Sequence, residues 1–278
     1  MTPDKRKPVA GGSSRRMTPG LAPAYDVLGI PVAALGWQEA LDLVAGRIKR
    51  GEFLRVAWLN AHCANIAWQT PRYRAALNDF LVLPDGLGVD LAASLWHGKK
   101  FPANLNGTDF TPALIRHIKT PLRIGLLGAR PEVTEKAVTF FAGLAPQHEV
   151  RMISDGYFVP EQEEGILKKL ADFHPDILLV AMGVPRQELF IADKLTKHHC
   201  TAAFAVGALF DLQTGTVPRA PLWIRKLRVE WLYRLWQEPG RLWRRYIIGN
   251  FLFVTRLVWA RISRRTTTST NSNIDGEA

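Results

Sequence analysis

The chain has 278 residues, 47% of them hydrophobic and 22% charged, which suits one large globular α/β domain or two small ones. Cys63 and Cys200 are too few and too far apart for a disulfide framework or a metal site, and they indicate a cytosolic protein with reduced thiols. Residues 1–22 lack the apolar core of a secretory signal, and no apolar run reaches the roughly 20 residues that a membrane span needs.

Nearly all of the net charge of +11 lies in one segment near the C-terminus. Twelve Lys and Arg stand between Arg219 and Arg265, against only Glu230 and Glu238, whereas residues 23–218 sum to about −1. The same segment holds five of the nine tryptophans, at positions 223, 231, 236, 243 and 259. Cations mixed with large apolar rings favour contact with an anionic membrane surface over oligomer or core packing, and we expect no nucleic-acid partner.

The expected elements alternate between strands and helices. In chain order they are a strand at Tyr25–Ile30, a helix at Trp37–Lys49, a strand at Leu54–Trp58, helices at Ala61–Gln69 and Pro71–Asn78, a strand at Phe80–Leu83, helices at Leu87–His97 and Thr108–Lys119, a strand at Leu122–Leu127, a helix at Pro131–Ala145, a strand at Glu149–Ile153, a helix at Glu161–Phe173, a strand at Ile177–Ala181, a helix at Arg186–Lys197, a strand at Ala202–Val206, and helices at Pro221–Trp236 and Pro239–Arg261. This alternation predicts an α/β fold: a Rossmann-like, largely parallel sheet flanked by helices, with a basic helical C-terminal appendage.

Composition divides the chain into four parts. We expect a disordered arm over 1–22, an α/β domain over 23–218, a basic, Trp-rich, membrane-associating appendage over 219–265, and a disordered tail over 266–278.

Asp85 is the strongest candidate for chemistry. It follows an apolar strand and precedes Gly86, so it lies where ligands bind in open α/β sheets, beyond the carboxyl end of a strand. Partial burial there raises a carboxyl pKa and makes the group a general base for a sugar hydroxyl. Asn60, at the end of the preceding strand, suits the orientation of a hydroxyl. Both residues also suit a plain helix cap or turn.

Other predicted strands and helices meet at similar polar turns. Gly107, Thr108 and Asp109 open a helix, either as caps or as a site for hydroxyl or phosphate oxygens. Asp155-Gly156-Tyr157 offers a ring to stack on a base and a carboxylate for ribose or uracil, or else forms a tight turn. Gln187 and Asp211 follow two further strands and face the same crevice.

Several common motifs are absent from the sequence. There is no Asp-x-Asp nucleotide-metal motif, no zinc spacing of His and Cys, no GxSxG, no Walker loop and no GxGxxG. We therefore expect no metal and no cofactor, with arginines rather than a metal stabilising any diphosphate leaving group.

Taken together, the motifs resemble the WecG/TagA/CpsF family of bacterial glycosyltransferases (glycosyltransferase family 26). The resemblance covers about residues 25–250 and rests on Leu59-Asn60-Ala61, Pro84-Asp85-Gly86-Leu87-Gly88, Gly107-Thr108-Asp109, Leu127-Gly128-Ala129, Asp155-Gly156-Tyr157-Phe158, Gly183-Val184-Pro185-Arg186-Gln187-Glu188, Gly207-Ala208-Leu209-Phe210-Asp211, Arg219-Ala220-Pro221, Glu230-Trp231-Leu232-Tyr233-Arg234-Leu235 and Glu238-Pro239, with Arg241 and Arg244-Arg245-Tyr246.

The resemblance implies an inverting, metal-independent hexosyltransferase of surface or exopolysaccharide biosynthesis. It implies a UDP-sugar donor, a polyprenyl-diphosphate-linked saccharide acceptor, and a peripheral place on the cytoplasmic face of the cell membrane; homo-oligomerisation is left open. The implied roles are as follows: Asp85 as catalytic base; Asn60, Gly107, Thr108, Asp109 and Gln187 in the sugar pocket; Asp155, Gly156, Tyr157 and Asp211 on the nucleotide side; and Arg234, Arg241, Arg244 and Arg245 at the diphosphate.

One departure concerns the donor sugar. Many relatives have a threonine two residues before the asparagine, where this chain has Trp58. Because of this difference, the specificity of those relatives for acetamido sugars does not carry over directly to this chain. The stretch from Trp58 to Asn65 looks more like the exopolysaccharide branch, where glucose is the implied donor. An N-acetylated hexosamine or its uronic acid stays open.

Two rival functions compete with a glycosyltransferase. A Rossmann-like oxidoreductase or methyltransferase would need a glycine-rich loop after the first strand, which residues 27–32 do not provide. A non-enzymatic membrane scaffold would have little use for so many acids and glycines at strand ends.

Overall fold

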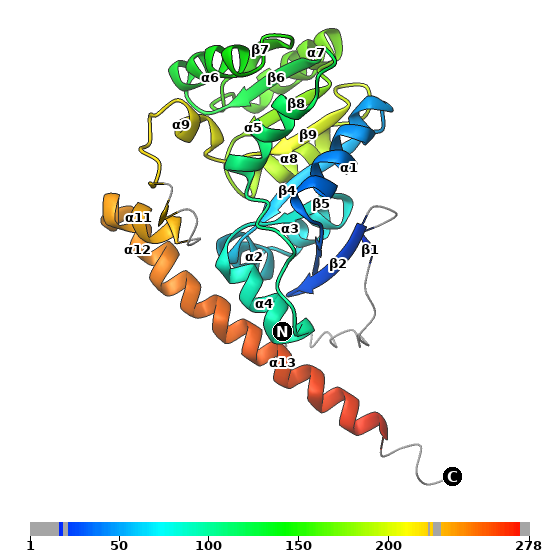
Figure 1. Ribbon diagram of the computed structural model, residues 1–278, viewed down its shortest axis with the longest axis vertical. Coiled ribbons are helices and arrows are strands. Elements are labelled where there is room, and N and C mark those ends of the chain that lie inside the picture. The colour runs from blue at the N-terminus through cyan, green and yellow to red at the C-terminus, as the bar shows by residue number, and fades with distance from the viewer. Residues whose placement is uncertain (1–16, 19–21, 222, 225–228, 273–278) are drawn as a thin grey trace.

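The computed structural model describes residues 17–18, 22–221, 223–224 and 229–272, and its centre is a six-stranded parallel sheet (Figure 1). The strand order is β5-β4-β9-β8-β6-β7. The strands are β4 (Leu54–Leu59), β5 (Leu81–Pro84), β6 (Arg123–Gly128), β7 (Glu149–Ser154), β8 (Ile177–Ala181) and β9 (Ala202–Ala205). The inner strands are almost wholly apolar because helices cover both faces of the sheet. The expected α/β fold with a parallel sheet is confirmed.

Helices cover the two faces in two groups. One face carries α2 (Ala61–Gln69), α3 (Pro71–Ala76), α4 (Leu87–His97), α7 (Glu163–Phe173) and α8 (Arg186–Lys194); the other carries α1 (Trp37–Lys49), α5 (Gly107–His117), α6 (Pro131–Leu144) and α9 (Leu209–Gln213). Alternate strand residues feed the two cores, so Leu178 and Val180 pack on the first face while Ile177 and Leu179 pack on the second. Short 3₁₀ helices η1 (Leu77–Asp79) and η2 (Pro160–Gln162) complete the domain. Between residues 37 and 206, each expected element ends within three residues of the observed one.

The N-terminal strand prediction was wrong. Instead of one strand over Tyr25–Ile30, an antiparallel hairpin joins β2 (Ala22–Val27) to β3 (Ile30–Ala33). The turn falls at Leu28 and Gly29, which both have positive φ, of 54° and 86°. Two consecutive left-handed residues reverse the chain in a two-residue hairpin loop, and a leucine at the first of them gives no turn signal. The arm expected over 1–22 lies mostly outside the described residues, but β1 (Met17–Thr18) pairs with β2.

The C-terminal segment is helical. It comprises α11 (Glu230–Gln237), α12 (Pro239–Trp243), a π-helical turn η3 (Arg244–Ile248) and α13 (Gly249–Ser272). The helix expected over Pro221–Trp236 includes residues 222 and 225–228, which lie outside the described residues; α11 begins only at Glu230. The helix expected to end at Arg261 continues to Ser272, into the segment 266–278 that composition assigns to a disordered tail.

Helix α13 runs along the domain beneath α2 and α4 and projects beyond it (Figure 1). Its buried side chains Phe253 and Leu257 belong to the same core as α2 and α4. Asn65 of α2 donates from Nδ2 to the Gly249 carbonyl (2.6 Å), and its Oδ1 accepts from Arg256 (2.5 Å). The helix is therefore part of the packed structure rather than an extension held only by its sequence neighbours.

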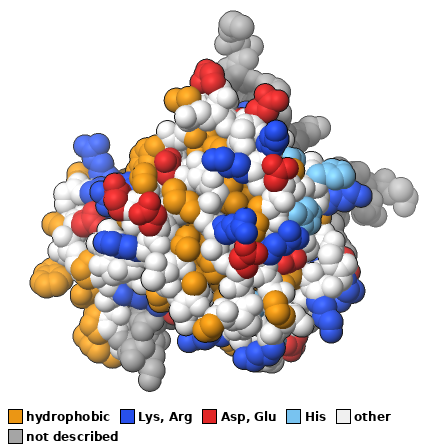
Figure 2. All heavy atoms as spheres, turned by 90° about the horizontal axis from the view of Figure 1, so that it is seen from above, with side chains coloured by type: hydrophobic (Ala, Val, Ile, Leu, Met, Phe, Trp, Pro, Cys, Tyr) orange, Lys and Arg blue, Asp and Glu red, His pale blue; other side chains and the backbone are white. Residues whose placement is uncertain are grey.

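The opposite side of α13 is apolar and uncovered. The exposed apolar side chains of η3 and α13 are Ile247, Ile248, Phe251, Leu252, Val254, Val258, Trp259 and Ile262. In contrast, Figure 2 looks from the end that lies at the top of Figure 1, and there acidic and basic side chains are interspersed. In the part of the chain that the structure describes, no helix is both long enough and apolar enough to span a bilayer.

Candidate functional site

Two cavities meet at the carboxyl ends of the parallel strands. The first, the sheet-edge cavity, has a volume of about 560 Å³ and is lined by residues that follow β4, β6, β7, β8 and β9. The second, the helix-side cavity, has a volume of about 750 Å³ and lies between α4, α11, η3 and α13. Both volumes fall in the range of small-molecule binding sites.

Six residues line both cavities. They are Asn60, Asp85, Thr108, Leu212, Arg234 and Arg245. The predicted base and two predicted appendage arginines therefore lie at the junction. A side chain at this junction can contact a ligand in either cavity.

Asp85 lies directly after β5, and its backbone N–H donates to the Leu59 carbonyl (3.0 Å). Asn60 donates from Nδ2 to Asp85 Oδ2 (3.2 Å), while its Oδ1 accepts the Cys63 N–H (3.0 Å) and caps α2. Asn60 thus serves both as a helix cap and as a partner of the carboxylate. Gly86 has a φ of 86° and donates its N–H to Asn104 Oδ1 (2.9 Å), which turns the chain away after Asp85.

Burial raises the pKa of Asp85 above its ordinary value. The hydrogen bond from Asn60 opposes this pKa shift, the negative charge of Glu230 adds to it, and Arg234 and Arg245 oppose it. A raised pKa makes a carboxylate a stronger base for a hydroxyl proton.

The appendage arginines do not all reach the site. Arg234 and Arg245 line both cavities, and Arg241 lines the sheet-edge cavity, where its Nε donates to Glu238 (2.6 Å). Arg244 lines neither of the cavities formed by the described residues. It is exposed, and its guanidinium lies 5.5 Å from the Trp243 ring centre. Three of the four predicted diphosphate ligands are therefore brought together, and the structure gives no support for the fourth.

The start of α5 forms one wall of the site. Gly107 lines the sheet-edge cavity, and a Cβ there would lie only 3.0 Å from the Trp58 ring. Trp58 is held by its own bond from Nε1 to the Leu105 carbonyl (2.5 Å). Glycine is therefore favoured at 107, because a larger residue would have to displace the Trp58 ring by a few tenths of an ångström.

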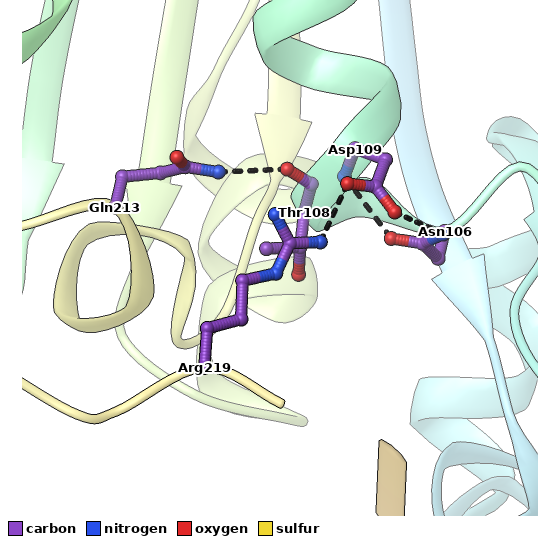
Figure 3. A network of polar contacts seen from close by, with 5 residues as sticks. All are labelled: Asn106, Thr108, Asp109, Gln213 and Arg219. Atoms are coloured by element: carbon purple, nitrogen blue, oxygen red, sulfur yellow. Dashed lines mark hydrogen bonds and ion pairs between the residues drawn. The ribbon is translucent and has the colours of Figure 1, made fainter. Parts of the chain in front are cut away.

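Both carboxylate oxygens of Asp109 are occupied by hydrogen bonds that fix the start of α5 (Figure 3). Its Oδ1 accepts from Arg219 Nη2 (2.6 Å) and its Oδ2 accepts from Asn106 Nδ2 (3.1 Å). Gln213 Nε2 donates to the Thr108 carbonyl (2.7 Å), which ties α9 to the same turn. Asp109 still lines the helix-side cavity, but its contacts are those of a positioning residue.

Three of the four residues predicted for the nucleotide side line the sheet-edge cavity: Gly156, Tyr157 and Asp211. Tyr157 is 71% exposed, so one ring face is available for stacking. Gly156 packs closely on the loop after β6, where a Cβ would lie 3.0 Å from the Ala129 nitrogen. Asp155 lines neither cavity of the described chain; its Oδ1 accepts the Tyr157 N–H (2.7 Å) and shapes the turn.

Gln187 joins two loops at the floor of the sheet-edge cavity. Its Oε1 accepts from the N–H groups of Gly183 (3.2 Å) and Gly207 (3.0 Å), and its Nε2 donates to Glu188 Oε1 (2.9 Å). All three bonds are internal, so Gln187 supports the loops that follow β8 and β9.

Glu188 is a site residue that the sequence prediction missed. It lines the same cavity with only 1% of its surface exposed, and its Oε2 has no hydrogen-bond partner among the described residues. Burial raises its pKa to about 7, against the lowering effect of the Gln187 bond. A glutamate in the first turn of a helix looks like an ordinary dipole-stabilising residue, so only the tertiary structure reveals this burial.

The helix-side cavity contains further residues that the sequence prediction missed. They are His62, Asp90, Ser94, Lys100, Asn104 and Glu230. Burial, with a smaller effect of Arg245, lowers the pKa of His62 to about 4, so its imidazole is neutral at physiological pH. None of these residues was assigned a role from the sequence, although Glu230 stands in the stretch Glu230–Leu235 and His62 in the stretch from Trp58 to Asn65. Among the described residues, no group of three or more His, Cys, Asp or Glu side chains is arranged to hold a metal ion.

A comparison with known protein families gives one match that covers most of the chain. Residues 25–267 match the model of the glycosyl transferase WecG/TagA/CpsF family. The matched region includes the whole parallel sheet, both cavities and the part of α13 that packs on α2 and α4.

Proposed function

The chain belongs to the WecG/TagA/CpsF family of glycosyltransferases, and from this we propose a specific reaction. In this proposal, the protein transfers a hexose-type sugar from a UDP-sugar to a polyprenyl-diphosphate-linked saccharide, with inversion and without a metal ion. The product belongs to surface polysaccharide or exopolysaccharide biosynthesis. The observation that carries the proposal is the position of Asp85 at the junction of two cavities.

Two cavities suit a reaction of two substrates. The sheet-edge cavity offers the exposed ring of Tyr157 to a base and the cation of Arg241 to a diphosphate, as a sugar nucleotide requires. The helix-side cavity opens between α4 and α13, which suits an acceptor that arrives on a lipid. The donor sugar and the acceptor hydroxyl then meet beside Asp85.

The proposed chemistry is a single displacement. Asp85 takes the proton of the acceptor hydroxyl as its oxygen forms a bond to the anomeric carbon. The bond from that carbon to the diphosphate oxygen breaks on the opposite face, and UDP leaves with the electron pair. Asn60 holds the Asp85 carboxylate in position through its 3.2 Å hydrogen bond.

Arginines stabilise the leaving diphosphate in this proposal. Arg234 and Arg245 line both cavities and Arg241 lines the donor side, so positive charge surrounds the position of the breaking bond. Guanidinium groups pair with phosphate oxygens through two parallel N–H bonds. Such groups supply the charge stabilisation that a divalent ion provides in other transferases.

We also propose that the exposed apolar face of η3 and α13 lies in the cytoplasmic surface of the cell membrane. Phe251, Val254 and Val258 face outwards on the helix that also forms a wall of the helix-side cavity. The exposed Arg241 and Arg244, which precede this face in the sequence, add positive charge. Arg256 and Arg261 instead turn towards the domain, where they donate to Asn65 and to the Leu95 carbonyl. Apolar side chains flanked by cations are typical of helices that lie in an anionic interface.

The test is a product assay with the full-length protein. Polyprenyl-diphosphate-linked saccharide is incubated with a panel of UDP-sugars in EDTA, and the glycolipid is weighed by mass spectrometry and its anomeric linkage determined by NMR. The expected product gains one hexose, with the anomeric configuration opposite to that of the donor. A retained configuration, or a strict requirement for added metal, would exclude this mechanism. Failure of every lipid-linked acceptor would exclude the acceptor class.

A further inference from the structure

The helix-side cavity runs along one side of α4. Its lining includes Leu87, Asp90, Leu91 and Ser94, which recur at helical spacing on this side of the helix. Because a helix rises 1.5 Å per residue, Leu87 and Ser94 lie about 10 Å apart along its axis. Asp85 stands at the end where α4 begins, so the cavity leads from the proposed base towards the C-terminal half of the helix.

Lys100 lies in the lining on the loop that follows α4. It follows the left-handed Gly98 that ends α4, and its loop folds back on the helix because Phe101 N–H donates to Asp90 Oδ1 (3.3 Å). Among the described residues, Lys100 is the one cation that lines this cavity and not the other. Arg234 and Arg245 are shared with the donor side, and His62 is neutral. If a second ligand binds in the helix-side cavity, its anionic group can therefore pair with Lys100, which does not line the sheet-edge cavity proposed for the donor diphosphate.

Apolar side chains border the same cavity. Leu87 and Leu91 of α4 and Val254 of α13 line it, although each is more than 40% exposed. Val254 also belongs to the uncovered face of η3 and α13, so an apolar surface continues from the cavity wall to the outside of the molecule. Exposed apolar residues that line a binding cavity mark the path of an apolar part of its ligand.

From these three observations we infer how the acceptor is oriented in the helix-side cavity. Its reacting sugar lies at Asp85, its diphosphate pairs with Lys100, and the first isoprene units of its lipid cross Leu87, Leu91 and Val254. The inference rests on the proposed function for the identity of the acceptor. Beyond the proposed function, it assigns Lys100 to the acceptor diphosphate and an apolar surface to the acceptor lipid.

A binding experiment without sugar transfer tests the inference directly. Farnesyl diphosphate, farnesol and inorganic diphosphate are titrated into the full-length protein by calorimetry, with saturating UDP present to occupy the sheet-edge cavity. Lys100→Gln is expected to weaken farnesyl diphosphate binding about tenfold or more, the usual cost of losing one charge-assisted hydrogen bond. The matched control Lys99→Gln removes the neighbouring charge, which does not line the cavity, and is expected to change binding less than about twofold.

The lipid path has its own variant. Leu91→Asn is expected to weaken farnesyl diphosphate binding about tenfold or more and to leave inorganic diphosphate binding unchanged, because only the former carries an isoprenoid chain and the substitution adds no charge. Unchanged farnesyl diphosphate binding in Lys100→Gln, or equal losses in Lys99→Gln and Lys100→Gln, would overturn the assignment of Lys100. Unweakened binding of farnesyl diphosphate or farnesol by Leu91→Asn would overturn the lipid path.

Kinetics separate this inference from the proposed function. In the transfer assay, Lys100→Gln is expected to raise KM for the lipid-linked acceptor and to leave KM for the UDP-sugar unchanged. A raised KM for the UDP-sugar instead would place Lys100 on the donor side and refute the inference. If the protein transfers no sugar but farnesyl diphosphate binding still depends on Lys100, then only the proposed function fails.

Discussion

Arg219 Nη2 lies 2.6 Å from Asp109 Oδ1, and this ion pair joins the first residue of the basic segment to the helix that borders the site. The Arg219 side chain is only 20% exposed. Asp109 is held from its other side by Asn106. The pair thus fixes where the chain leaves the α/β domain on its way to Arg234 and Arg245.

Breaking this pair should impair catalysis more than folding. We expect Arg219→Met to lower the transfer rate about 10- to 100-fold, because small displacements of charge-stabilising groups are costly. The thermal midpoint should fall by only a few degrees. The control Arg72→Met removes the exposed ion pair with Asp193 and should keep transfer within about twofold of the wild type. Equal effects of the two variants on transfer would show that the Arg219 pair does not position the arginines.

Asp85 should control the acid limb of the pH–rate profile. We expect Asp85→Asn to lower turnover by roughly 10²–10⁴-fold with the fold intact, and to abolish the rise in rate with pH that ionisation of the base produces. Because the pKa of Asp85 is raised, this rise should lie above the pH range of an ordinary aspartate. A variant with near-normal turnover would eliminate Asp85 as the base.

The same substitution should stabilise the protein at neutral pH. A carboxyl whose pKa is raised by folding supports stability below its unfolded pKa, and that contribution is lost as the pH rises through the folded value. At pH 7 the native protein therefore carries the cost of the raised pKa of this carboxyl, and asparagine, which does not titrate, removes that cost. Thermal unfolding of Asp85→Asn should shift upwards at pH 7 and much less at pH 4; a downward shift at pH 7 would contradict the burial of the charge.

Glu188 should make stability fall as the pH rises towards 8. Its folded pKa of about 7 lies above the ordinary value, so its contribution is lost between about pH 4.5 and pH 7. The expected loss is on the order of 3 kcal/mol. Urea unfolding of the wild type at pH 5.5 and 8.5 should show the part of this loss that falls between these pH values, on the order of 2 kcal/mol, and Glu188→Gln should reduce it. The exposed Glu132→Gln serves as the control and should leave the difference unchanged.

Membrane attachment should depend on the exposed face of α13. We expect Phe251→Asp combined with Val258→Asp to abolish sedimentation with anionic vesicles, because both side chains point away from the domain. Neither residue belongs to the packed core, so the thermal midpoint should change little. Thr139→Asp on α6 introduces the same kind of side chain at a distant exposed site and should leave sedimentation unchanged. Full sedimentation of the double variant would refute the proposed membrane face.

The sequence predicts the parallel sheet well because its strands are buried on both faces. Runs such as Ile177–Ala181, bounded by turn residues, admit few other structures. The hairpin at Leu28 was missed because its reversal depends on a left-handed leucine, for which no propensity argument exists.

The site was predictable where a side chain follows a strand directly. Asn60 and Asp85, which follow β4 and β5 directly, line both cavities, whereas Gln187, six residues after β8, supports two loops. The chemistry of Glu188 and Lys100 was not predictable, because the burial of the first and the folded-back loop of the second depend on distant contacts. The same limit explains why Asp109 and Asp155, expected to contact ligands, instead hold Arg219 and the Tyr157 turn.

The shared wall between the two cavities has a consequence for recognition. Arg234 and Arg245 face both compartments, so an anion bound in one changes the electrostatic potential in the other. Thermodynamic linkage requires this influence to be mutual: whatever factor bound UDP-sugar applies to acceptor affinity, bound acceptor applies to UDP-sugar affinity. In the proposed reaction, an affinity measured for either substrate alone would therefore differ from its affinity in the ternary complex.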